Sequence, residues 1–397
     1  MWKHLILILI LGVVMTGCHK SAVPLSDFFV MQASDLHVLS PELFDDSELL
    51  KQVEQGGDGK QIRDSYSLFQ AMLQTVRAEQ PDALILTGDL SFHGDIVSHQ
   101  LIAKDLTELQ TDGIPVYVLP GNHDWTTFPY GYFGEEGVPA RGTSVEEFEA
   151  IYHSFGHDQA FSRDESSYSY AVEINPTTWL LMIDTNQPGM MSRLSSSTSD
   201  WAEHMIRTAE ASGIQLITAS HQNLFQHHAL FSRGFRMVGA ENLIEALEKY
   251  PPVIHLSGHM HVQHQVEQSG VREAATSSLA IWPHHIARIR PTGYQAASIA
   301  LPEEDLTASH TFFRQASIDK AMSHFSDDPP NETVALAEYV ADINEAYFSG
   351  NLTTLAELKE HPMAAAWASL VGEARFADYI QAILAETATD HRIKDFQ

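Results

Sequence analysis

The feature that most constrains how this chain folds is a series of short apolar runs, each followed at once by side chains that can bind a metal. The clearest run, 116–119, stops at Pro120 and is followed by Asn122, His123 and Asp124. Short apolar runs bounded by Gly or Pro are typical of buried strands. Taken alone, this stretch is equally well a polar turn. Its recurrence along the chain favours strands that lead into a common site.

Two earlier runs, 28–33 and 83–86, end in the same manner, and the segments between the runs have helical apolar spacing. Strands and helices that alternate at this spacing predict βαβ units and a parallel sheet. Right-handed crossovers bring the ends of such strands to one edge of the sheet. The side chains that follow these three runs are therefore expected to converge: Asp35, His37, Asp89, Asn122 and His123.

The second part of the chain repeats this organisation. Three further apolar runs end in polar residues, with helical patterns between the runs. The run 179–183 is followed by Asp184, the run 215–219 by His221, and the run 253–256 by His259 and His261. From about 262 to 314 the chain is strand-like and turn-rich, without a long helical pattern. No internal repeat is visible.

Two segments lack periodicity and are expected to be loops. Residues 38–60 are polar and carry glycines. Residues 126–145 hold aromatics, Gly and Pro directly after the expected site. Long loops in such positions are often lids over a site, and a surface insertion explains the segment equally well.

The polar residues at these strand ends are carboxylates, an amide and imidazoles. Cys18 is the only cysteine of the chain, so the ligands of a metal here must be oxygen or nitrogen, as suits Zn, Fe and Mn. Two ions about 3.5 to 4 Å apart need a shared anionic ligand, and Asp89 after Gly88 is the best candidate. A pair of ions at this spacing would neutralise the oxygens of a phosphate ester during its hydrolysis. His123 is then a candidate to hold the phosphoryl group of that ester or to protonate its leaving oxygen, with Asp124 fixing the His123 tautomer.

Five ordered motifs resemble the signature blocks of the calcineurin-like metallophosphoesterases: Asp35-Leu36-His37, Gly88-Asp89, Gly121-Asn122-His123-Asp124, His221 and Gly258-His259-Met260-His261. The resemblance covers residues 28–261 and implies an α/β fold, a sandwich of two β-sheets flanked by helices. By the family pattern, one metal is held by Asp35, His37, Asp89 and His261, and the other by Asp89, Asn122, His221 and His259. The implied cofactors are two divalent or trivalent ions of Mn, Fe or Zn.

The first 17 residues are expected to be a signal peptide and not part of the fold. Lys3 precedes an apolar stretch, 5–14, and the small residues Thr16 and Gly17 precede Cys18. The stretch is too short for a permanent membrane span. Its ending is similar to a bacterial lipoprotein signal, which predicts export and lipidation of Cys18. A plain secretory peptide is the alternative.

The charge balance excludes some partners. The 23 basic and 52 acidic residues give a net charge of -29. Long-range repulsion then opposes binding to nucleic-acid polymers and to anionic membranes. We therefore expect a small phosphate ester as partner and membrane contact only through a lipid anchor, with the oligomeric state left open.

The last segment has a different pattern. Apolar stripes at helical spacing run through 336–347 and 376–384. We expect a signal peptide at 1–17, a catalytic domain at 18–315, and a small all-helical C-terminal appendage at 316–397 that packs on itself or on the main domain. An exported protein with such an appendage is similar to secreted class III cyclic-nucleotide phosphodiesterases.

These patterns predict a dinuclear enzyme that hydrolyses phosphodiesters, cyclic nucleotides among them, by in-line attack of a hydroxide held on the metals. A nucleotidase or phosphomonoesterase is the alternative within the enzyme class. A metal-stabilised binding protein, whose helical domain recruits a partner, is the alternative outside it.

Several further residues are weaker candidates, each of which is more often structural. Six additional histidines are near the motifs, three arginines are possible phosphate clamps, and two aromatic residues are possible platforms for a nucleobase. They are His93, His99, His227, His228, His284 and His285; Arg141, Arg288 and Arg290; and Tyr130 and Trp282.

Overall fold

The structure is a computed structural model, and the residues it describes are 27–125, 128–187, 189–229, 231, 233–325, 333–370 and 375–396. The expected signal peptide and the expected lipidation site, Cys18, lie outside these residues. Within the described ranges, no helix combines the length and the apolar composition needed to cross a bilayer.

The first sheet has six strands in the order β17-β16-β15-β1-β2-β3. Their bounds, in that order, are Ile393–Asp395, Gly293–Ser298, His285–Arg290, Val30–Ala33, Ala83–Thr87 and Val116–Leu119. The strands β1, β2 and β3 are parallel neighbours, whereas β15 joins β1 in antiparallel fashion. The carboxyl ends of β1, β2 and β3 therefore meet at one edge of the sheet, as the pattern of the sequence predicted.

The second sheet has seven strands in the order β13-β14-β12-β11-β8-β7-β6. Their bounds are His264–Gln268, Val271–Ala275, Ile254–Ser257, Gln215–Ser220, Thr178–Ile183, Tyr170–Asn175 and Ser162–Arg163. The central strands β8, β11 and β12 are parallel. A short pair, β9 (Asn186–Gln187) and β10 (Met190–Met191), follows β8.

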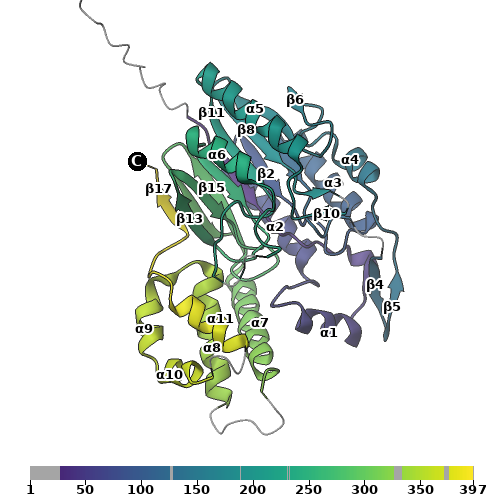
Figure 1. Ribbon diagram of the computed structural model, residues 1–397. Helices are drawn as coiled ribbons and strands as arrows, with labels where there is room; N and C mark the ends of the chain where they lie inside the picture. The colour runs from purple at the N-terminus through teal and green to yellow at the C-terminus, as the bar shows by residue number, and fades with distance from the viewer. Residues whose placement is uncertain are drawn as a thin grey trace, which may run out of the picture.

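The two sheets pack face to face with helices outside, which confirms the predicted sandwich (Figure 1). Alternate residues of β8 show why the sheet has two covered faces. Leu180 and Met182 join the core between the sheets, while Leu181 and Ile183 pack under the outer helices α5 (Ser196–Ser212) and α6 (Glu241–Lys249). Side chains alternate across a strand, so a fully apolar strand must be covered on both faces.

Three more helices belong to this sandwich: α2 (Ser65–Glu79), α3 (Ile96–Thr111) and α4 (Val145–Tyr152). Leu68, Met72 and Val76 recur at four-residue spacing on α2 and are buried in the main core. A stripe at this spacing gives a helix one apolar face, which it must bury against the sheet.

Both segments expected to be loops contain regular structure. Residues 38–60 include a short 3-10 helix at Pro41–Leu43 and α1 (Glu48–Gly56), and residues 126–145 include a hairpin of β4 (Tyr130–Phe133) and β5 (Glu136–Pro139). Only Leu50 and Glu54 of α1 are buried, and β5 is exposed throughout. Helix α1 has only three apolar side chains, Leu49, Leu50 and Val53, and β4 and β5 are four residues each, so each element is shorter than the window in which a periodic pattern can be recognised.

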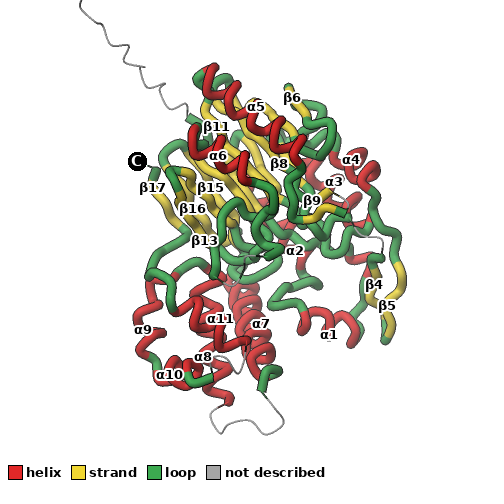
Figure 2. Tube along the Cα trace, viewed as in Figure 1, coloured by secondary structure: helices red, strands yellow, loops and turns green. Residues whose placement is uncertain are grey.

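The C-terminal helices form a separate cluster below the sandwich in Figure 1 and Figure 2. They are α7 (Glu303–Met322), α8 (Thr333–Ser349), α9 (Leu355–Glu360), α10 (Pro362–Ala368) and α11 (Arg375–Leu384), with a 3-10 turn at Leu352–Thr354. Their core includes Met260 and Val262 from the main domain, so the helices pack both on themselves and on the sandwich. The chain then returns to the first sheet as β17.

Helix α7 corrects the expectation of strands and turns up to residue 314. It begins at Glu303, so the expected domain boundary at 316 falls inside it. The residues that α7 buries are Ser309, Phe313, Ser317 and Ala321, at four-residue spacing. Three of these are small and two are hydroxyl residues, so the buried face of α7 does not read as an apolar stripe in the sequence.

Candidate metal centre

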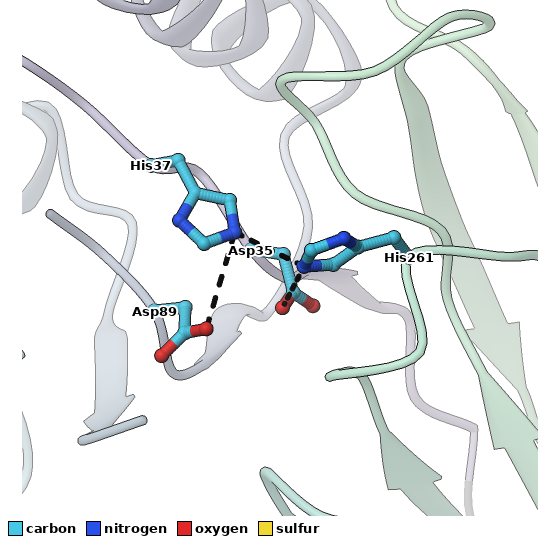
Figure 3. Close-up of side chains that lie close together, drawn as sticks. All are labelled: Asp35, His37, Asp89 and His261. Carbon is cyan, nitrogen blue, oxygen red and sulfur yellow. Dashed lines mark hydrogen bonds and ion pairs between the residues drawn. The ribbon is translucent and has the colours of Figure 1, made fainter. Parts of the chain in front are cut away.

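Four side chains from three strand ends face one point at the edge of the sandwich (Figure 3). Nε2 of His37 lies 3.1 Å from Nε2 of His261 and 3.9 Å from Oδ2 of Asp89. Oδ1 of Asp35 lies 3.3 Å from the same His261 nitrogen. Among the described residues this Asp35 oxygen has no hydrogen-bond partner, although it is buried. A buried anionic oxygen without a donor fits a cation at this point.

A second group of donor atoms adjoins the first through Asp89. Nε2 of His221 lies 3.4 Å from Oδ2 of Asp89 and 3.1 Å from Oδ1 of Asn122. Nδ1 of His259 lies 3.2 Å from the same His221 nitrogen. The structure thus brings together all seven residues predicted as ligands, although His221 is 99 residues from Asn122 in the chain.

The Asp89 carboxylate has the orientation that a bridging ligand needs. Its Oδ1 accepts the backbone N–H of His123 at 2.8 Å. Its Oδ2 faces His37 on one side and His221 on the other. One oxygen is therefore held by the backbone, and the other lies between the two groups of donors.

The imidazole tautomers also fit two cations. Nδ1 of His221 lies 2.7 Å from the carbonyl of Thr87, and Nε2 of His259 lies 2.9 Å from the carbonyl of Gly234. Each of these nitrogens must donate its proton to the carbonyl, so the other nitrogen of a neutral ring presents a lone pair to the centre. Carbonyls that accept a hydrogen bond from the far nitrogen of the ring are a common means by which proteins orient histidine ligands. The facing lone pairs repel one another unless a proton or a metal ion lies between them.

The electrostatics point the same way. Burial lowers the pKa of His221, but Asp89 and Asp35 raise it to about 9. Burial raises the pKa of Asp89, but His221 and His123 together lower it well below its usual range. Burial, followed by His221, lowers the pKa of His259 to about 4, which leaves the neutral ring that metals require. The site therefore stabilises positive charge while its carboxylates stay ionised.

The backbone at this edge adopts a conformation that most residues avoid. Five of the seven candidate ligands have a positive φ: Asp35, His37, Asp89, His259 and His261. Asp and His tolerate this region better than most residues, but it still costs about 1 to 3 kcal/mol each. Gly121 allows the two loops to approach closely, because a Cβ there would overlap the backbone and carboxylate of Asp89. Strain of this kind is typical of functional sites.

Asp124 does not have the role predicted for it. Its Oδ2 accepts the N–H of Gly121 at 2.7 Å and its Oδ1 accepts the N–H of Ser91 at 2.9 Å. The tautomer of His123 is set instead by the carbonyl of Phe92, 2.9 Å from its Nδ1. The adjacent position in the chain suggested a direct contact, but the turn sends the two side chains in different directions. Asp124 anchors the loop that carries Asn122 and His123.

The three arginines considered as phosphate clamps are engaged elsewhere. Arg288 pairs with Glu79, Arg141 pairs with Glu147, and Arg290 lies 3.8 Å over the ring of Phe29. Two aromatic residues were considered as stacking partners for a nucleobase. The Trp282 ring packs against His310, with ring centroids 4.7 Å apart, and Tyr130 is exposed on the β4–β5 hairpin. Sequence proximity to the motifs was therefore a poor guide for these residues.

The additional histidines divide into one near the centre and several that are structural. His93 lies beside His123, with ring centroids 5.9 Å apart and nearly parallel planes. His99 is buried behind Asp124, and His227 lies 3.2 Å from Glu273. His284 Nδ1 donates to the carbonyl of Leu279 at 2.7 Å, within its own turn.

Two features of the site had no signal in the sequence. Gln222 donates to Asn122 Oδ1 at 3.3 Å and to Asn186 Oδ1 at 2.8 Å, so it orients the predicted ligand Asn122. Burial lowers the pKa of the Lys60 amine, while Asp58, Asp89 and Asp35 raise it in part, so this cation is within electrostatic range of the centre. Lys60 lies in the segment expected to be a plain loop, and only its tertiary position reveals it.

Comparisons with known proteins identify the family of this chain. The family model described as calcineurin-like phosphoesterase matches residues 30–263, more than half of the chain. A solved dimetal phosphatase from Danio rerio is 13% identical, with 68% of this chain and 95% of that chain covered and a TM-score of 0.47. A purple acid phosphatase from yellow lupin (Lupinus luteus) seeds is 14% identical, with 68% and 51% covered and a TM-score of 0.44. The search of curated proteins gives no match.

Proposed function

We propose that this chain, which belongs to the calcineurin-like phosphoesterase family and hydrolyses phosphate esters, acts on phosphodiesters. We further propose that it acts through a dinuclear metal centre. The observation that carries this proposal is the pair of donor groups that share Oδ2 of Asp89. Ions bound there would neutralise the phosphate oxygens and lower the pKa of a bound water. The metals remain Mn, Fe or Zn in this proposal.

The protein's own residues have distinct tasks in this mechanism. Asp35, His37 and His261 would hold one ion, and Asn122, His221 and His259 would hold the other, with Asp89 available to both. His123 is half-buried beside His37, with ring centroids 5.0 Å apart, and Phe92 fixes its tautomer. Because Nδ1 donates its hydrogen to Phe92, Nε2 carries a proton only when the ring is protonated, and in that form Nε2–H can hydrogen-bond a phosphoryl oxygen or pass the proton to the leaving oxygen.

The choice of diesters over monoesters is supported by the arginines. A phosphodiester carries one negative charge, whereas a monoester carries up to two near neutral pH and is usually held by additional cations. Arg141, Arg288 and Arg290 are all committed to other partners. A nucleotidase or phosphomonoesterase is the alternative, and a substrate panel separates the two.

Removal of metal is expected to abolish hydrolysis, and Mn²⁺ is expected to restore it. The charged donors of the centre cannot polarise a phosphate without the ions they hold, so activity should track metal content. The measurement is the rate on a 4-nitrophenyl diester and on the matching monoester, after chelation and after addition of Mn²⁺, Fe²⁺ or Zn²⁺. A faster rate on the monoester would replace the diester proposal by the phosphomonoesterase alternative, and a rate unaffected by chelation would contradict the dinuclear mechanism.

The proposal extends to location: we expect export and a lipid anchor on Cys18, which the apolar stretch 5–14 and the residues Thr16-Gly17-Cys18 support. A Cys18→Ser variant is then expected to lose the anchor. Fractionation should find the wild-type protein with membranes and the variant in the soluble fraction. An N-terminal peptide of the membrane-bound protein that carried no lipid on Cys18 would contradict the anchor.

A further inference from the structure

A cavity of about 480 Å³ lies between the C-terminal helices and the metal centre. His259 and His261, one from each donor group, are part of its lining. Its volume is in the range of small-molecule sites, which are usually clefts of about 300 to 1,000 Å³. A group that is attached to a phosphate at the centre would therefore reach this cavity directly.

The walls of the cavity are mostly apolar and combine segments that are far apart in the chain. Phe313 and Ala316 of α7, Phe348 of α8 and Tyr379 of α11 form the helical side. Phe235 forms the other side, with its ring centroid 5.3 Å from that of His259. The C-terminal helices thus supply much of the surface beside the metal centre.

These aromatic rings are exposed to the cavity to a degree unusual for a core. Phe235, Phe348 and Tyr379 are only half-buried, whereas Phe313 beneath them is 1% exposed. Half-buried apolar rings that face one cavity leave apolar surface in contact with water, which costs free energy that an apolar ligand recovers. Polar side chains also line the cavity, among them Lys320, which is paired with Asp58 at 3.0 Å.

We propose that this cavity binds an apolar group of the substrate, so that the enzyme prefers phosphate esters of bulky aryl or alkyl alcohols to those of small or polar alcohols. This inference rests on the proposed function of the adjacent centre and assigns the C-terminal helices to substrate selection. The aromatic walls offer ring faces and edges to an aromatic group and apolar area to an alkyl chain. A polyol would lose water from its hydroxyl groups against the apolar rings without gaining the same contact.

The test uses esters of methanol, butanol and 2-phenylethanol, each as the monoester and as the methyl diester. These primary alcohols have similar acidity, so differences in kcat/KM report binding and not the chemistry of the leaving group. We expect kcat/KM to be about tenfold or more higher for 2-phenylethyl than for methyl esters, since apolar pockets discriminate by about this factor per methylene.

The variant Ala316→Phe fills the cavity from α7 and is expected to lower the ratio of kcat/KM for 2-phenylethyl esters to that for methyl esters towards one. Ala308→Phe is the matched control, because Ala308 is exposed on the same helix and lies outside this cavity. If Ala316→Phe does not fold, Phe348→Ala, which removes a wall, should also reduce the preference. Equal kcat/KM for the three alcohols in the wild type, or an unchanged preference in both variants, would overturn the inference.

A binding measurement separates this inference from the proposed function. Calorimetry with Mn²⁺-loaded protein compares 2-phenylethylphosphonate with methylphosphonate, neither of which needs to be hydrolysed. About tenfold tighter binding of the phenylethyl compound, lost in Ala316→Phe, supports the cavity assignment even if no ester is turned over. Equal affinities would exclude it, whatever the activity.

Discussion

Replacement of Asp89 by asparagine is expected to lower kcat/KM by about a thousandfold or more, because a bridging ligand supports the charge of two ions at once. The asparagine can still accept the N–H of His123 through its amide oxygen, as Asp89 Oδ1 does at 2.8 Å. It cannot offer an anionic oxygen to both donor groups. The loss should therefore appear in metal content as well as in rate, with the fold retained.

The measurements for this variant are metal content after dialysis, rate on the phosphodiester, and circular dichroism. Asp112→Asn is the matched control, since Asp112 is 49% exposed, pairs with Arg77 and lies away from the centre. This control should keep full activity with the same change in charge. Equal rates in Asp89→Asn and wild type would remove the basis of the proposed mechanism.

Replacement of His123 by alanine is expected to slow turnover by about 10² to 10⁴-fold while both ions stay bound, as for the loss of a general acid. Asn122→Ala is expected to have the opposite profile, with weaker metal occupancy as the primary defect. The distinction follows from geometry, because Asn122 Oδ1 faces His221 among the donors, whereas the His123 ring lies beside them. Metal analysis and single-turnover rates on both variants test it.

A leaving-group comparison decides what His123 contributes. If His123 protonates the leaving oxygen, the loss in His123→Ala should be much larger for an alkyl ester than for a 4-nitrophenyl ester, whose product leaves without a proton. Similar losses on both esters would assign His123 to the phosphoryl oxygens alone. His153→Ala, at an exposed position, is the histidine control. Loss of metal from the His123 variant would overturn the division between the two residues.

The C-terminal helices show where patterns in a sequence stop being informative. The stripe of α8, from Leu336 to Tyr347, predicts a buried helix and the structure has one. Helix α7 buries mainly small and hydroxyl residues, so the same criterion misses it. An apolar stripe predicts that a helix packs against another surface, but it does not identify that surface. Contact with Met260 and Val262, and hence the position of the helices beside the metal centre, is visible only in the folded chain.

The candidate centre divides in a similar way. The ligand types and their order at strand ends are local properties, and strands that are parallel must bring those ends to one edge. These local properties predicted the parallel strands and the convergence of five side chains: Asp35, His37, Asp89, Asn122 and His123. The two-sheet sandwich and the set of seven candidate ligands were implied by the resemblance of the five motifs to a known family. The partner of Asp124, the orientation of Asn122 by Gln222, the nearness of Lys60 and the aromatic cavity depend on contacts between segments far apart in the chain. Such contacts follow from how the elements pack, and only the tertiary structure decides them, because no local periodicity encodes which side chains meet across an interface.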